Sequence, residues 1–246
     1  MKKISIITVV LNDAEHIEKT ILSVINQDFN SIEYIVIDGN STDGTVQIIK
    51  KYSKYIDIFI SEKDKGLYDA MNKGLRMATG EYILFLNSGD RLFENNTISK
   101  IFSVFNNADV YYGDTIIISK DGKNLGLRRL RPPKKLTWKS LKKGMLVSHQ
   151  AFVPKRALCP DFDLNFKYSS DYDWMIKVLK KAKIIINTKQ ILIEYLDDGL
   201  TKKNLVKSLK ERFIIMKKNY GLLQTIFRHI GFGVRLTFFY IKNRWF

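Results

Sequence analysis

The sequence is short of cysteine, of long apolar runs and of acidic residues, and each shortage excludes a class of protein. Cys159 is the only cysteine among 246 residues, which excludes an intramolecular disulfide and a CxxC metal site and suits a reducing compartment. No run reaches 18 uninterrupted apolar residues, so we expect no transmembrane helix. We expect no signal peptide either, because Met1-Lys2-Lys3 leads directly into a strand-like segment and then into polar residues.

Acidic residues are outnumbered, with 25 Asp and Glu against 41 Lys and Arg, which gives a net charge of +16 at pH 7. This excess implies an anionic partner: a nucleotide, a nucleic acid or an acidic membrane surface. The hydrophobic fraction of 45% with 14 glycines and 4 prolines is typical of a globular chain. A chain of this length can fold as one large domain or as one domain with an appendage.

Strand-like and helix-like segments alternate through the first half. β-branched runs predict strands over Ile4–Val10 and Glu33–Ile37. The apolar run that begins Tyr82–Asp90 predicts a strand buried on both faces and ending in a polar loop. Alternation at this spacing predicts an α/β fold with a parallel sheet. The GxGxxG and Walker A motifs are absent, so a bound nucleotide would not be held by a Gly-rich phosphate loop.

Acids or small polar groups follow the predicted strands, in the segments 8–12, 38–43 and 87–90. Parallel strands bring their carboxyl ends to one edge of the sheet, so we expect a cleft there. In that position Asp90 is well placed to hold a divalent cation, and the cation to hold a diphosphate. The plainer interpretation is that Asp38 and Asp43 stabilise turns and that Asp69, on a predicted helix over Leu67–Ala78, is a solvated residue.

Three segments, in order along the chain, resemble the inverting family 2 glycosyltransferases of the GT-A fold, of the type that builds bacterial surface polysaccharides. VIDGNSTDGT (Val36–Thr45) is similar to their nucleotide-binding signature, and SIITVVLN (Ser5–Asn12) to their first strand. The segment Ser61–Asp90 is similar to the stretch that leads into their metal motif. The resemblance covers residues 4–195 and implies a Rossmann-like, mixed but mainly parallel sheet flanked by helices.

The resemblance also implies roles for residues of the first half. Asp38 would hydrogen-bond the base, expected to be uracil, and the other residues would surround the base, ribose and diphosphate. The implied nucleotide-sugar-binding residues are Thr8, Asn12, Asp38, Asp69, Asn72, Asn87 and Ser88. The family commonly has Asp-x-Asp followed by another Asp, whereas this chain has Asn87 and Gly89 at the first two acidic positions. We therefore expect Mg²⁺ or Mn²⁺ to be held mainly by Asp90.

The second half is expected to hold the acceptor. Lys120–Lys143 is strongly basic, and it is either a solvated loop or a lip that meets a diphosphate-lipid acceptor. His149 and Gln150 match a polar pair that the resembling enzymes place near the active site, which implies contact with the acceptor or the diphosphate. A lone histidine is more often structural, so both interpretations of His149 stay open.

The resemblance places the catalytic base at Asp171, with Ser170 replacing the Glu of the family's Glu-Asp motif. An inverting transfer needs one carboxylate, which removes the proton of the acceptor hydroxyl as the oxygen attacks C1 of the sugar. Asp173 competes for this role. Alternatively, Asp171 only caps the helix predicted over Trp174–Lys183.

The chain divides into a predicted catalytic domain, residues 1–200, and a basic and apolar helical tail, residues 201–246. Within the domain, residues 1–114 form the nucleotide-sugar half and residues 115–200 the acceptor half with the base. The tail contains one acid, Glu211, and basic amphipathic segments rich in Phe, Leu and Trp are typical of a membrane interface. A packed helix or a dimer contact is the alternative. We expect a cytoplasmic protein that is peripheral on the inner face of the plasma membrane.

The motifs together predict an inverting hexosyl- or N-acetylhexosaminyltransferase. The predicted donor is a nucleotide sugar, UDP-linked, and the predicted acceptor is a glycan on a polyprenyl diphosphate, an intermediate of surface polysaccharide or O-antigen synthesis. One alternative is a catalytically weak or inactive protein that binds sugar nucleotides, given Asn87 and Gly89. The other is a basic nucleic-acid-binding module, which is disfavoured because the strands carry aliphatic residues and end in acids. No nucleic acid is expected as a partner.

Overall fold

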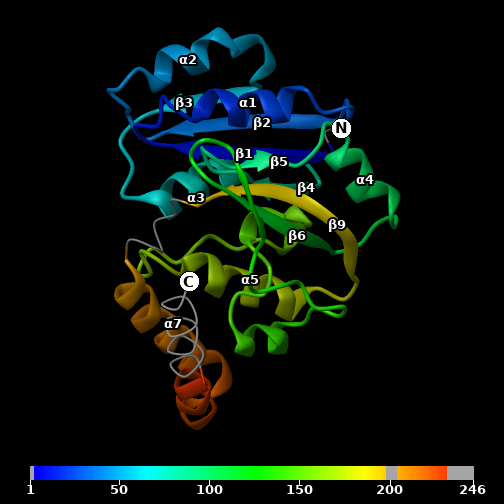
Figure 1. The fold of residues 1–246 in the computed structure, drawn as a ribbon, viewed down its shortest axis with the longest axis vertical. Coiled ribbons are helices and arrows are strands. Elements are labelled where there is room, and N and C mark those ends of the chain that lie inside the picture. The colour runs from blue at the N-terminus through cyan, green and yellow to red at the C-terminus, as the bar shows by residue number, and fades with distance from the viewer. Residues whose placement is uncertain (1–2, 198–203, 232–246) are drawn as a thin grey trace.

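The computed structural model of the chain describes residues 3–197 and 204–231. Its first sheet, at the top of Figure 1, has the strand order β3-β2-β1-β4, and every pair of neighbours is parallel. Its strands are β1 (Ile4–Val10), β2 (Ile32–Asp38), β3 (Ile58–Ser61) and β4 (Tyr82–Phe85). β1 is buried along its whole length and β2 along nearly all of it. Burial on both faces explains why these strands are continuous apolar runs rather than alternating ones.

Helices flank this sheet, as the alternating sequence pattern predicts. Right-handed crossovers place α1 (Ile17–Ile25) and α2 (Thr45–Lys51) on one face and α3 (Leu67–Met77), which returns across the sheet, on the other. α3 packs directly against β1 and β2. A Cβ atom at Gly74 of α3 would lie 2.4 Å from Cγ2 of Ile7, so this close packing of helix on sheet requires glycine.

The second sheet lies below the first in Figure 1 and is mixed. β6 and β9 run parallel at its centre, and the other strand pairs are antiparallel. Its strands are β5 (Arg91–Leu92), β6 (Val110–Ile118), β7 (Asn124–Leu127), β8 (Phe152–Pro154) and β9 (Ile185–Leu196). The sequence pattern predicts two short strands, Ile184–Ile186 and Ile191–Tyr195, whereas the structure has the one long strand β9. The ladder between β6 and β9 instead continues through a shift of register near Asp114.

Aromatic side chains join the two halves into one core. Phe85 at the end of β4 lies 5.2 Å from Phe162 and 5.7 Å from Trp174, measured between ring centroids, and the latter two rings stack at 5.0 Å. Trp174 belongs to α5 (Ser170–Lys181), which begins four residues before the predicted helix. The remaining short helices are α4 (Thr97–Ser103) and the 3₁₀ turns η1 (Ser53–Tyr55), η2 (Trp138–Lys143), η3 (His149–Ala151) and η4 (Arg156–Leu158).

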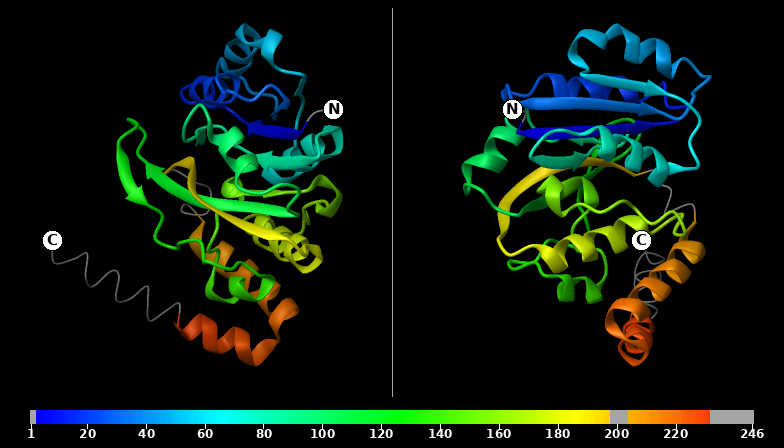
Figure 2. Two further views of the ribbon diagram at one scale, coloured as in Figure 1. Left: turned by 90° about the vertical axis from the view of Figure 1, so that its right-hand side faces the viewer. Right: turned by 180° about the vertical axis from the view of Figure 1, so that it is seen from behind.

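α7 (Leu205–Tyr220) lies at the end of the molecule opposite the first sheet, as the views of Figure 2 show. It is attached through buried Ile215 and Met216 and through Tyr220, which stacks on Trp138 at 5.6 Å. The chain is helical again over residues 222–231. The rest of the predicted tail, residues 201–203 and 232–246, lies outside the described residues. Among the described helices, none is both long enough and apolar enough to cross a membrane.

Candidate functional site

A cavity of about 490 Å³ opens between the two sheets, where β1 and β4 end and α3 and α5 begin. Residues predicted from both halves of the sequence line it: Asn12, Asn87, Ser88, Asp90, His149, Gln150 and Asp171. Its wall also contains Arg128, from the basic segment Lys120–Lys143, and polar residues that the sequence did not single out for a site: Asp13, His16, Tyr68, Tyr195 and Arg212. The fold thus brings the predicted metal residue and the predicted base into one cavity.

Thr8 and Asn72 are placed differently from the prediction, because neither lines this cavity. Thr8 is fully buried in β1, with its hydroxyl 3.2 Å from the hydroxyl of Tyr34. Asn72 is buried in α3, where its side-chain amide exchanges two hydrogen bonds with the backbone of Phe162 at 2.7 and 3.0 Å. Both side chains have internal partners, and their contacts hold secondary-structure elements together.

Asp38 and Asp69 also lie outside the wall of the cavity. The carboxylate of Asp38 accepts hydrogen bonds from the Ser41 backbone at 3.0 Å and from the Ser61 hydroxyl at 2.6 Å, which fixes the loop after β2. Asp69 accepts a hydrogen bond from the backbone of Lys65 at 2.9 Å, just before α3. The contacts of Asp38 are those of the plainer interpretation, in which it stabilises a turn. Asp69, which that interpretation makes a solvated residue, instead holds the backbone just before α3.

The loop that carries Asp90 is anchored to α1. The hydroxyl of Thr20 accepts a hydrogen bond from the backbone N–H of Gly89 at 3.0 Å and donates one to the carbonyl of Asp90 at 2.8 Å. Gly89 has a φ of +92°, and a Cβ atom there would lie 2.7 Å from Cδ2 of Leu196. An acid at this position would therefore need both a strained backbone and a displaced Leu196, which explains why glycine replaces it.

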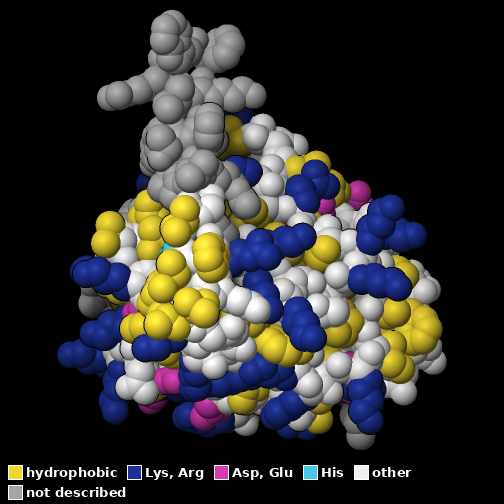
Figure 3. Space-filling model, turned by 90° about the horizontal axis from the view of Figure 1, so that it is seen from below, with side chains coloured by type: hydrophobic (Ala, Val, Ile, Leu, Met, Phe, Trp, Pro, Cys, Tyr) yellow, Lys and Arg dark blue, Asp and Glu magenta, His cyan; other side chains and the backbone are white. Residues whose placement is uncertain are grey.

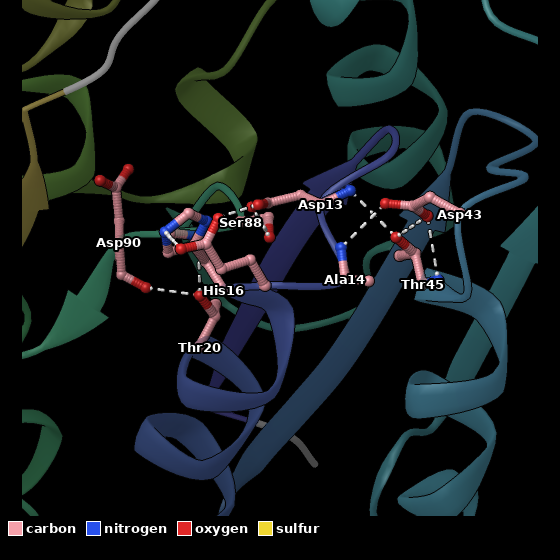
Figure 4. Close-up of polar contacts among 10 residues, drawn as sticks. Asp13, Ala14, His16, Thr20, Asp43, Thr45, Ser88 and Asp90 are labelled. Atoms are coloured by element: carbon pink, nitrogen blue, oxygen red, sulfur yellow. Dashed lines mark hydrogen bonds and ion pairs between the residues drawn. The ribbon is translucent and has the colours of Figure 1, made fainter. Parts of the chain in front are cut away.

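Asp13 connects the same loop to the loop after β1, although no sequence motif singled it out. Its carboxylate accepts a hydrogen bond from the Ser88 hydroxyl at 2.6 Å and contacts Nδ1 of His16 at 2.6 Å (Figure 4). Its backbone N–H donates to the hydroxyl of Thr45 at 2.9 Å, and that hydroxyl in turn donates to Asp43 at 2.6 Å. The loops that follow β1, β2 and β4 are thus tied together at one edge of the first sheet.

The Asp90 carboxyl group is buried, with 4% of the residue exposed. One oxygen accepts a hydrogen bond from Nε2 of Gln150 at 2.8 Å, and the other accepts one from the backbone of Leu196 at 3.1 Å. Desolvation by burial raises the pKa of Asp90 to about 7, although both hydrogen bonds oppose the rise. Gln150, which we expected to touch the acceptor or the diphosphate, is thus placed against the predicted metal residue.

The donor set around Asp90 decides whether a divalent cation fits. Among the described residues, no three His, Cys, Asp or Glu side chains cluster as metal ligands. Asn87, in the same loop, has a buried side-chain oxygen without a hydrogen-bond partner. One carboxylate and one free amide oxygen suit Mg²⁺ or Mn²⁺ when a bound diphosphate supplies further oxygens. The residues therefore fit a cation that arrives with a nucleotide.

Asp171 lies in the first turn of α5, and the N-cap of that helix is Ser169, so the capping interpretation of Asp171 is wrong. One oxygen of Asp171 accepts hydrogen bonds from the Tyr68 hydroxyl at 3.1 Å and from the Tyr172 backbone at 2.8 Å. The other lies 3.1 Å from Nδ1 of His149. His149, predicted to contact the acceptor or the diphosphate, is thus paired with the predicted base.

Asp171 is buried yet held in its ionised form. Burial alone would raise the pKa of Asp171, but the hydrogen bond and the charge of His149, the charge of Arg212 and the Tyr68 hydroxyl together lower it below its ordinary value. The competing residue Asp173 is 1% exposed, forms an ion pair with Lys177 at 2.6 Å and does not line the cavity. Of the two aspartates, only Asp171 can meet a bound molecule.

Comparisons with known proteins agree with this geometry. Residues 5–159 match the family model described as "Glycosyl transferase family 2". A PGL/p-HBAD biosynthesis glycosyltransferase of Mycobacterium bovis is 27% identical over 201 residues, 77% of this chain and 74% of the relative. The Escherichia coli UDP-Glc:alpha-D-GlcNAc-diphosphoundecaprenol beta-1,3-glucosyltransferase WfgD is 28% identical over 240 residues, 94% of each chain. The solved structure of S. aureus TarS 1-349 with UDP-GlcNAc superimposes with a TM-score of 0.70 at 18% identity, over 94% of this chain and 73% of TarS 1-349.

Proposed function

Because this chain belongs to glycosyl transferase family 2 and is a glycosyltransferase, we propose that it moves a sugar from a UDP-linked donor to a lipid-linked glycan with inversion at C1. The observation that carries the proposal is one cavity that both Asp90 and Asp171 line. An inverting transfer needs one group near the leaving diphosphate and one base near the attacking hydroxyl. The two aspartates supply one of each.

We assign the donor to the end of the cavity that lies at the edge of the first sheet. Asn12 and Ser88 line it there, at the carboxyl ends of parallel strands, where ligands of open α/β sheets bind. The proposal of UDP is supported by the names of two similar proteins, since WfgD uses UDP-Glc and the TarS fragment was solved with UDP-GlcNAc. WfgD also supports the acceptor, because its name specifies a sugar on a diphosphoundecaprenol.

In the mechanism we assign, the carboxylate of Asp171 removes the proton of the acceptor hydroxyl while that oxygen attacks C1 of the donor sugar. His149 orients one carboxylate oxygen, and its proximity keeps Asp171 ionised at neutral pH. Asp90 and Asn87 would hold Mg²⁺ or Mn²⁺ together with the diphosphate, and such an ion offsets the charge of the leaving UDP. No covalent intermediate is needed, so Asp171 acts alone as the base.

The function is tested with purified protein, a panel of UDP-, GDP- and dTDP-sugars, and a lipid-linked acceptor extract, with release of nucleoside diphosphate as the readout. We expect release from a UDP-hexose or a UDP-N-acetylhexosamine only when the acceptor is present. Tight binding of UDP without release from any donor would favour an inactive sugar-nucleotide-binding protein. Release from GDP- or dTDP-sugars alone would contradict the proposed donor.

We also propose that the enzyme works in the cytoplasm, on the inner face of the plasma membrane. Leu222, Leu223, Ile226, Phe227 and Ile230 are all exposed on the helical segment 222–231. The face of the molecule in Figure 3 shows hydrophobic side chains gathered among many lysines and arginines. Apolar groups surrounded by positive charge suit the interface of a membrane that contains anionic lipids.

A double substitution of Leu223→Glu and Phe227→Glu tests this surface. The two side chains are four residues apart on a helix and are 72% and 73% exposed, so they lie on one face and their loss disturbs little packing. Burial of one such side chain is worth roughly 1.5–3 kcal/mol, so we expect at least about tenfold weaker cosedimentation with phosphatidylglycerol vesicles. Met77→Glu, at a 46% exposed site on α3, is the matched control. Equal sedimentation of all three proteins would contradict membrane docking through this helix.

A further inference from the structure

Two arginines from distant parts of the chain reach the same cavity. Arg128 directly follows β7, and Arg212 lies in α7, beyond the residues that match the family model. Both act electrostatically on the Asp171 side of the cavity, because the charge of Arg212 contributes to the low pKa of Asp171 and the charge of Asp171 acts on Arg128.

The guanidinium groups of these arginines have donors to spare. Arg128 donates through Nη1 to the carbonyl of Met145 at 2.6 Å and makes a long contact with the carbonyl of Leu130 at 3.4 Å. Arg212 rests over the ring of Tyr172, with Cζ 6.0 Å from the centroid, and its buried Nε has no hydrogen-bond partner. A guanidinium carries five N–H groups, so most of them remain open. Within residues 3–197 and 204–231, neither arginine forms an ion pair with a carboxylate.

The local charge balance favours an anion between the two arginines. Burial, and then the like charge of Arg212, lower the pKa of Arg128 to about 10. Two carboxylates act on Arg128, Asp171 and Asp114. The oxygens of Asp171 already accept hydrogen bonds from Tyr68 and the Tyr172 backbone and face His149, and Asp114 accepts one from Nε of Arg131 at 2.8 Å. A ligand with two or more negative charges and several acceptor oxygens would satisfy both guanidinium forks, as phosphates and diphosphates do.

We propose that Arg128 and Arg212 bind the diphosphate of the lipid-linked acceptor, at a subsite separate from the Asp90 loop that faces the donor. The inference rests on the proposed function. The acceptor fits better than the donor because the arginines lie on the side of the base, where the attacking hydroxyl must sit. α7, which carries Arg212, leads through Gly221 into the exposed apolar helical segment 222–231, so a lipid that leaves this subsite would meet an apolar surface.

Equilibrium binding of farnesyl diphosphate to the full-length protein, with UDP present at saturation, tests the subsite. Arg212→Met should weaken this binding by at least tenfold, and Arg212→Lys by about three- to tenfold, because lysine keeps the charge but loses the bidentate fork. The Kd of UDP should change less than twofold. Arg76→Met, at an exposed position of α3 outside the cavity wall, is the control and should bind farnesyl diphosphate like the wild-type protein. Farnesol, which lacks the diphosphate, should bind at least tenfold more weakly.

The following results would contradict the proposal that the two arginines bind the diphosphate of the acceptor. If Arg212→Met weakens UDP and leaves farnesyl diphosphate unaffected, the pair serves the diphosphate of the donor. If neither ligand is affected, or farnesol binds as well as farnesyl diphosphate, the arginines hold no diphosphate. Should Arg212→Met fail to fold, Arg212→Lys decides by the same criteria. Binding at equilibrium requires no sugar transfer, so a failure of the proposed enzymatic activity would be seen separately, in the donor panel.

Discussion

Asp171→Asn should reduce kcat by a factor of about 10²–10⁴ while the Kd of the UDP-sugar stays nearly unchanged. Asparagine keeps the shape of the side chain and one oxygen that can accept a hydrogen bond from the Tyr68 hydroxyl or the Tyr172 backbone. It has no carboxylate to accept the proton of the acceptor hydroxyl. Single-turnover rates, donor affinity by calorimetry and melting temperature, measured on the same preparation, separate loss of the base from loss of the fold.

Asp173→Asn is the matched control, because it removes a carboxylate from the same turn of α5. Asp173 is buried against Lys177 and does not line the cavity. Loss of one member of a buried ion pair lowers stability, so we expect a lower melting temperature and an unchanged kcat for the molecules that remain folded. If Asp171→Asn were fully active, the role of base would pass from Asp171, and His149, whose Nδ1 faces it, would be the next residue to test.

The first half of the fold was predictable because its signals are local. β1 has the predicted bounds Ile4–Val10, and the α/β, GT-A fold and the family are confirmed. The strand predicted to precede the polar loop at Asn87 ends at Phe85. Its partner β1 continues further, and the backbone N–H of Ser88 still donates to the carbonyl of Val9 at 3.1 Å. The apolar run therefore predicted the strand, and the polar loop after it contains the left-handed residue Gly89.

The site was only partly predictable, because much of it depends on contacts between distant segments. Asp90 and Asp171 were predicted from the sequence, but nothing in it pairs Gln150 with Asp90 or His149 with Asp171. Arg212 reaches the cavity only because α7 docks on the second half, which no local pattern shows. Thr8, a polar residue in a strand buried on both faces, has a hydrogen-bond partner inside the sheet, and its role at the nucleotide stays a prediction.

The Asp90 loop, residues 87–90, lacks acids at two of the three positions where the resembling enzymes commonly have aspartate. The first acidic position is Asn87, whose buried oxygen lacks a partner. The second is Gly89, where a side chain would strain the backbone and displace Leu196. Asp90 is therefore the one carboxylate of this loop, and its burial raises its pKa to about 7. A protein site with so few ligands should bind a free divalent cation weakly and bind it well only beside a diphosphate.

Asp90→Ala should accordingly abolish the binding of Mn²⁺ in the presence of UDP and reduce turnover by roughly 10²–10³, the loss expected when several kcal/mol of charge stabilisation is removed. Calorimetric titration of Mn²⁺ with and without UDP measures the first effect independently of catalysis, and EDTA should suppress the wild-type rate to a similar extent.

The Asp90→Ala substitution leaves Nε2 of Gln150 and the Leu196 backbone without an acceptor, which costs about 1–3 kcal/mol of stability. Asp90→Asn keeps an acceptor for one of them, so it controls for that cost and should still fail to bind the ion tightly. A wild-type enzyme that is fully active in EDTA would contradict the metal role. Lysine and arginine side chains would then have to offset the negative charge of the leaving diphosphate.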